Sequence, residues 1–187
     1  MTSPFSNPVG RARDAAAAYT AALLALVGDR DPFAILAELP AALPPLVVDG
    51  LTDAELGRPE APGKWSIAQV LDHLADQETV NAFRFRVVVA EDEPPIQGYD
   101  QDRWAARLRY GTAAPRTILA ELVGLRARNL RLLRALSPDE LRRVGHHQER
   151  GPESVEHILR LNAGHDIVHR RQIARIRTSL GRHTAAP

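Results

Sequence analysis

"SIAQVLDHLADQETVNAFRFRVVVAED", residues 66–92, is the stretch that decides the fold. Ser66 and Gln69 have the spacing of a capping box, in which two residues at a helix start bond reciprocally to the backbone. After them, one face of the segment repeats every three or four residues, as in a helix. This face comprises Ile67, Val70, Leu71, Leu74, Asn81, Phe85 and Val88. The final VVVA would also suit a strand, but the length of the pattern favours one helix over about residues 66–91.

Residues 30–51 form an earlier helical segment that is rich in proline. Pro40, Pro44 and Pro45 lie inside its apolar pattern. Each proline lacks the backbone N–H that a helix interior uses. We therefore expect this helix to be kinked or interrupted.

Two later segments also have helical patterns. Residues 113–136 place leucines on one side and arginines on the other, which indicates an amphipathic helix. A final helix is expected over about residues 152–179, with Gly181 beyond its end as a stop signal. Residues 93–112 contain two prolines and two glycines, so they are predicted to form a long connection with a turn of helix around Trp104.

The sequence as a whole predicts an all-α protein. We find no strand series of useful length. The polar segment "VGHHQERGP", residues 144–152, carries His146 and His147 and is better interpreted as a solvated loop; the alternative is that these two histidines lie at the mouth of a pocket.

Composition excludes several functional classes. The 24 basic and 23 acidic side chains nearly cancel to a net charge of +1, so no field of one sign favours nucleic acid or an anionic membrane as a partner. No apolar run is long enough to span a bilayer, and the first ten residues lack the features of a secretory signal. We expect a cytoplasmic protein. The absence of cysteine excludes thiolate ligands and cysteine nucleophiles, which draws attention to the seven histidines.

His165 and His169 lie four residues apart on the apolar face of the last predicted helix. At this spacing two imidazoles can converge on one transition-metal ion at about 2.1 Å. The alternative is a chance pair of buried, hydrogen-bonded rings, since seven histidines make one such spacing unsurprising. Catalytic metal sites commonly use three protein ligands, and His73 on the flank of the helix over 66–91 is the best third candidate. A histidine there can also be an ordinary core residue.

Three stretches together resemble a known family. They are "PGKWSIAQVLDHLAD" (62–76), "EPPIQGYDQDRWA" (93–105) and "GHDIVHRRQI" (164–173), and in order and spacing they are similar to the DinB/YfiT-like metalloenzymes. The similarity covers roughly residues 30–178. It implies a four-helix bundle with a long crossover connection, often a homodimer, here with an extra N-terminal helix.

The resemblance also implies a metal site. The ligands would be His73, His165 and His169, and the ion a divalent transition metal such as nickel, zinc, iron or manganese. The domain organisation expected from it is an N-terminal helical extension over residues 1–29, a DinB-like four-helix bundle over 30–180 and a disordered tail over 181–187.

Four polar residues beside these histidines are further candidates. Asp76, Gln77, Asp166 and Gln172 could orient the ligand imidazoles or the ion's water, but each could equally be an ordinary surface or capping residue. The leading functional hypothesis is a metal-dependent hydrolase that acts on a small molecule. The alternatives are a metal-dependent thiol S-transferase or isomerase that uses a small thiol cofactor, and a metal-binding dimer without catalytic activity.

Overall fold

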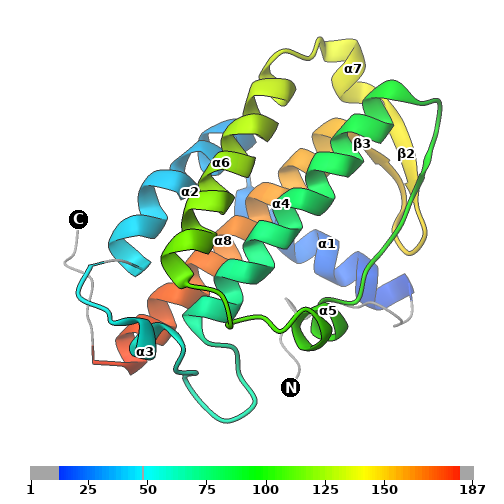
Figure 1. Cartoon of the computed structure of the whole chain (residues 1–187). Helices are drawn as coiled ribbons and strands as arrows, with labels where there is room; N and C mark the ends of the chain where they lie inside the picture. Colours follow the sequence, from blue (N-terminus) through cyan, green and yellow to red (C-terminus); the bar gives the residue numbers. More distant parts are fainter. Residues whose placement is uncertain (1–12, 48, 182–187) are drawn as a thin grey trace.

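Five long helices dominate the chain (Figure 1). The computed structural model describes residues 13–47 and 49–181. Residues 1–12 of the predicted extension, and the predicted tail after Gly181, lie outside the described residues. The long helices are α1 (Arg13–Val27), α2 (Pro32–Val47), α4 (Ile67–Ala90), α6 (Pro115–Arg134) and α8 (Val155–Ser179). Three short helices join them: α3 (Asp53–Leu56), α5 (Gln101–Arg107) and α7 (Pro138–Arg142).

Helices α2, α4, α6 and α8 form a four-helix bundle, as predicted, and α1 packs on α8 (Figure 1). The connection from α4 to α6 runs back along the bundle through α5 (Figure 1). Helices α4 and α6 therefore run in the same direction, whereas α4 and α8 are antiparallel neighbours (Figure 1). The long crossover is confirmed, and it leaves one side of the α4–α8 pair to be closed by α1 and the crossover.

The predicted capping box at the start of α4 is present. The Gln69 N–H donates to Ser66 Oγ at 3.3 Å, and the Ser66 N–H donates to Gln69 Oε1 at 2.9 Å. These bonds fix the first turn of the helix that carries His73, because they satisfy backbone donors that have no partner within the helix.

Helix α2 continues through its prolines as one helix, so the predicted possibility of an interruption is wrong. Pro40 cannot donate to the carbonyl oxygen of Leu36, four residues earlier. Arg126 of α6 donates to that oxygen instead, from Nη1 at 2.9 Å. A side chain from a distant part of the sequence thus satisfies the backbone group that the proline leaves free, which local sequence cannot reveal.

The chain is mainly helical, as predicted, but it also contains a small sheet that the sequence did not predict. Strands β1 (Pro95–Ile96), β2 (Val144–His147) and β3 (Gly151–Ser154) form a three-stranded sheet in the order β1-β2-β3. The β1–β2 pair is parallel and the β2–β3 pair is an antiparallel hairpin. The predicted solvated loop over 144–152 is therefore wrong. Its strands of two to four residues are too short to give a period-two pattern.

The middle of the bundle contains a buried polar layer between two apolar clusters. Arg126 pairs with Glu78 of α4 at 2.8 Å and with Asp166 of α8 at 2.6 Å. Asn129 and Asn162 donate to the Glu78 carboxylate at 2.9 and 3.0 Å. Charge-assisted bonds of this kind offset the cost of burying the ions, and they fix the lateral register of α4, α6 and α8.

None of the described helices is both long and apolar enough to cross a bilayer.

Candidate metal centre

Three histidines from two helices meet inside the bundle. His73 of α4 faces His165 and His169 of α8, and one ring nitrogen from each lies within 4.8 Å of the other two. The Nε2 atoms of His73 and His165 are 3.0 Å apart. The ring centroids are separated by 4.3 to 5.0 Å. The helical spacing of four residues places the α8 pair on one face, and the antiparallel packing of α4 brings the third ring to it.

Burial keeps these imidazoles neutral. His73 is 1% exposed and His165 is 4% exposed. Burial, followed by the charge of His169, lowers the pKa of His73 well below its usual value, and burial with the charges of His169 and His73 does the same for the pKa of His165. Burial also lowers the pKa of His169 to about 4, against a hydrogen bond to Gln172 that raises it. Neutral imidazole is the form that binds metal ions.

Gln172 fixes the orientation of one ring. His169 Nδ1 lies 2.8 Å from Gln172 Oε1. A carbonyl oxygen only accepts, so Nδ1 carries the proton and Nε2 keeps its lone pair. A metal-binding imidazole is commonly held by such a bond from its other nitrogen.

The residues present fit a divalent ion. Two neutral imidazole Nε2 atoms 3.0 Å apart can share one proton, or they can both direct lone pairs to a common ion. The Nδ1 atoms of His73 and His165 are buried and have no partner in the described part of the chain. All three possible ligands are nitrogens, a set that suits zinc, nickel, iron and copper.

The other predicted neighbours lie elsewhere. Both oxygens of Asp166 accept hydrogen bonds from Arg126. Asp76 accepts a hydrogen bond from the Tyr110 hydroxyl. Neither carboxylate belongs to the histidine cluster.

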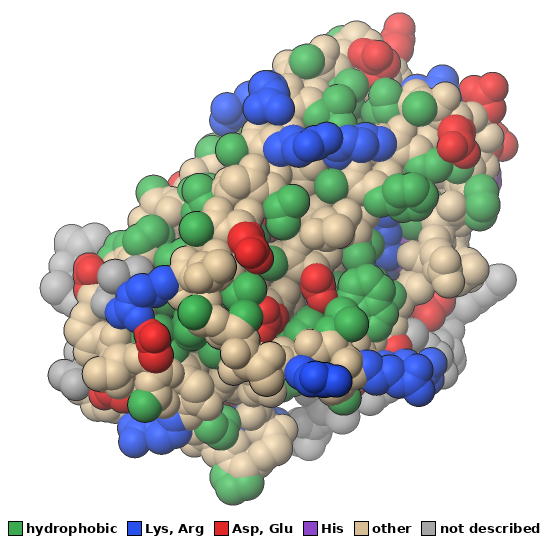
Figure 2. Space-filling view, in the orientation of Figure 1, with side chains coloured by type: hydrophobic (Ala, Val, Ile, Leu, Met, Phe, Trp, Pro, Cys, Tyr) green, Lys and Arg blue, Asp and Glu red, His purple; other side chains and the backbone are tan. Residues whose placement is uncertain are grey.

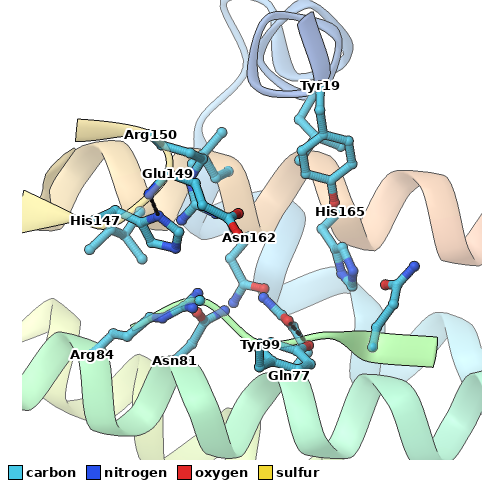
Figure 3. A pocket seen from close by; sticks show the side chains of 15 residues that line it. Tyr19, Gln77, Asn81, Arg84, Tyr99, His147, Glu149, Arg150, Asn162 and His165 are labelled. Atoms are coloured by element: carbon cyan, nitrogen blue, oxygen red, sulfur yellow. Dashed lines mark hydrogen bonds between the residues drawn. The ribbon is translucent and has the colours of Figure 1, made fainter. Parts of the chain in front are cut away.

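A polar cavity adjoins His165 (Figure 3). Gln77 lines it together with His165, and the Tyr99 hydroxyl donates to Gln77 Oε1 at 2.5 Å. Its walls come from α1, α4, the crossover, the β2–β3 hairpin and α8 (Figure 3). The other labelled side chains are Tyr19, Asn81, Arg84, His147, Glu149, Arg150 and Asn162.

The sequence did not predict most of the residues that line this cavity. The preferred interpretation of His147 as part of a solvated loop is wrong, and the alternative of a position at a pocket is closer, because the hairpin turns the side chain inward and leaves it 3% exposed. Asn81 was predicted on the buried face of its helix without a functional interpretation. A polar residue on an otherwise apolar stripe was the available signal, because such a group needs a partner when buried.

Comparisons with known proteins agree with this geometry. The chain matches the family model of the DinB superfamily over residues 36–173. It is 35% identical over 129 residues to "Putative metal-dependent hydrolase YfiT" of Bacillus subtilis (strain 168), which covers 69% of this chain and 70% of that protein. It is 32% identical over 133 residues to "Putative metal-dependent hydrolase OB0782" of Oceanobacillus iheyensis, covering 71% and 76%.

A solved structure is similar as well. YfiT from Bacillus subtilis, described as having an unusual four-helix bundle topology, superposes with a TM-score of 0.74 at 31% identity. The match covers 81% of this chain and 86% of that chain. The four-helix bundle fold is thus shared with a protein described as "a probable metal-dependent hydrolase".

Proposed function

The chain belongs to the DinB superfamily, and on this premise we propose that it is a metal-dependent hydrolase whose ion is held by His73, His165 and His169. The observation that carries the proposal is the convergence of three neutral imidazoles, two of them buried and that of His169 partly buried, beside a polar cavity. The names of the similar proteins support the same class of reaction.

The chemistry that a bound divalent ion supplies is Lewis-acid activation of water and of a carbonyl or phosphoryl oxygen. The chain's contribution is to hold the ligand nitrogens in place. Gln172 keeps the proton of His169 on Nδ1, and burial keeps all three rings unprotonated at neutral pH. Nickel, zinc, iron and manganese are the candidate ions, and availability commonly decides between such metals.

Gln77 is the best candidate for orienting a substrate beside this centre. Its Oε1 accepts from Tyr99, whose pKa is raised chiefly by burial, so the phenol stays protonated and keeps donating. This bond fixes the amide and leaves its NH₂ group as a donor at the cavity that His165 also lines. A donor in that place can polarise a substrate carbonyl.

Hydrolysis of a panel of small esters and amides tests the proposal. The full chain, loaded in turn with zinc, nickel, iron and manganese, should hydrolyse at least one class, and His165→Ala should reduce kcat/KM by at least about a hundredfold. His146→Ala is the matched control, because this histidine lies on β2 with half of its side chain exposed. Loss of metal without loss of hydrolysis, or equal losses in both variants, would refute the proposal.

A further inference from the structure

The cavity beside His165 contains an unusual concentration of unpartnered polar atoms. Asn81 Nδ2, Arg84 Nε, His147 Nε2 and Asn162 Oδ1 are buried without a hydrogen-bond partner in the described chain. All four residues line this one cavity, from α4, the hairpin and α8 (Figure 3). Buried polar groups are nearly always paired, so this group of atoms is consistent with a bound ligand.

Three of the four unpartnered atoms are hydrogen-bond donors. His147 Nδ1 accepts from the backbone N–H of Glu149 at 3.2 Å (Figure 3). The neutral imidazole therefore carries its proton on Nε2, the nitrogen without a partner. Burial, followed by the charge of Arg150, lowers the pKa of His147 to about 4, so it is neutral at pH 7. Asn81 Nδ2 and Arg84 Nε are donors by chemistry. A ligand group that accepts several hydrogen bonds fits these three donors.

Arg84 also contributes a positive charge to this cavity. Its side chain is 6% exposed, and its one hydrogen bond in the described structure runs from Nη2 to the Gln97 carbonyl oxygen at 2.8 Å. Arg150, on the same cavity, is paired with Glu153 at 2.5 Å. The charges of Glu153 and Glu149 also act on Arg84 and raise its pKa, but less than burial and the charge of Arg150 lower it. Burial and the charge of Arg150 lower the pKa of Arg84 to about 10, so the guanidinium stays charged at neutral pH. A buried cation in this state is costly, and an anion would offset the cost.

We propose that this cavity binds a carboxylate group of the substrate through Arg84, Asn81 and His147. A carboxylate has one negative charge, as Arg84 has one positive charge, and its two oxygens offer about four acceptor sites to the three donors. The inference rests on the proposed function, and it narrows the substrate to a small ester or amide with a carboxylate at a distance from the bond that is cleaved. Asn162 Oδ1 remains as an acceptor for an N–H or O–H of the same molecule.

Titration of the full chain with acetate, followed by NMR of the arginine Nε–H groups, tests the binding without any turnover. Arg177 is the matched internal control. It is 7% exposed, its Nε is also unpartnered, and it donates to the Leu46 and Asp49 carbonyl oxygens away from the cavity. At constant ionic strength, acetate should shift the Nε–H resonance of Arg84 until the shift saturates, and acetamide should not shift it. The Nε–H resonance of Arg177 should not change with either compound. Arg84→Lys and Arg177→Lys assign the two signals.

Three results would overturn the inference: no shift at Arg84, parallel shifts at both arginines, or a shift in zinc-loaded protein that is absent from metal-free protein. The last result would mean that acetate binds to the metal ion and not to Arg84.

A second test applies once a hydrolysed substrate class is found. Arg84→Gln should raise the KM for substrates of that class that carry a carboxylate, by about tenfold to a hundredfold, and should leave the KM for neutral substrates nearly unchanged. Equal loss for both would contradict the inference. If acetate shifts the Arg84 signal but the protein hydrolyses none of the tested substrates, the proposed function is contradicted and the carboxylate site is not.

Discussion

Gln172 is the residue on which the orientation of His169 depends, since its Oε1 accepts from His169 Nδ1 at 2.8 Å. Gln172→Ala should weaken zinc binding about tenfold to a hundredfold, because removing such a partner frees the ring and its tautomer. Gln172→Glu keeps an acceptor and should retain the affinity. Competition with a chromophoric chelator gives the affinities. Wild-type affinity in Gln172→Ala would mean that the bond has no part in metal binding.

The three imidazoles should also make the stability of the metal-free chain depend on pH. Their pKa values in the folded chain are lowered, to about 4 for His169, while an unfolded histidine has a pKa near 6.5. The unfolded state therefore binds more protons below about pH 6.5. Stability should be fully present above that pH and fall as the pH drops towards 4, by up to ~1.4 kcal/mol per pH unit for each such group.

The informative comparison is between the pH dependence of stability in the wild type and in His165→Phe. Burial raises the pKa of Asp166 from 3.8 to about 6 despite Arg126, so between these two pH values the folded state binds more protons at this carboxyl and its contribution to stability runs in the opposite direction. Urea unfolding of metal-free wild type and of His165→Phe between pH 7.5 and 5 separates the two contributions. The variant should show a shallower loss of stability towards low pH. Identical slopes would show that His165 is not a buried neutral base.

The role of helix α1 is the least obvious from the sequence. Gly164 of α8 explains how α1 can pack closely against α8. A Cβ at Gly164 would lie 2.5 Å from the Leu23 carbonyl oxygen, so α1 can approach α8 only because this residue has no side chain. Leu23 and the neighbouring Tyr19 of α1 line the cavity beside His165. The predicted boundary at residue 29 stays a prediction, but α1 contributes to the wall of the candidate site.

Gly164→Ala should displace α1, because the clash is with backbone that cannot rotate away. We expect a loss of ~1–3 kcal/mol in the free energy of unfolding, as for other overpacked sites, and faster proteolysis within α1. Gly124→Ala is the control. It lies in α6 with nothing within 4 Å of the added carbon, so the higher helix propensity of alanine should make it neutral or stabilising. A stable Gly164→Ala with α1 protected would contradict this packing.

The elements differ in how far local sequence determines them. The capping box predicts the start of α4, and the apolar stripes predict both α4 and α8, because these signals act within a few residues. The continuity of α2 depends on Arg126, 90 positions after Leu36. The hairpin depends on β2 pairing with β1, about 50 residues earlier, and on Gly151 at φ +83°. The three histidines were predicted from the HxxxH spacing together with the family resemblance. His147 reaches Asn81 and Arg84 of α4 only through that same hairpin, which is why the sequence did not reveal this group of donors.

The whole molecule presents a mixed surface. Figure 2 shows Lys and Arg side chains interspersed with Asp and Glu over this face, with apolar side chains between them. The net charge of +1 gives the same picture for the chain as a whole. A few charged side chains are buried instead, among them Glu78, Arg126 and Asp166 in the polar layer and Arg84 at the cavity. The homodimer implied by the resemblance remains a prediction.

Elemental analysis of the purified and reloaded full chain tests the central claim most directly, namely that three imidazoles from α4 and α8 hold one ion. The predicted result is close to one divalent transition ion per chain in the wild type and in His146→Ala, and almost none in His165→Ala. A folded wild-type chain that cannot be loaded with any of these metals would contradict the claim, as would a His165→Ala variant that retains the full metal content.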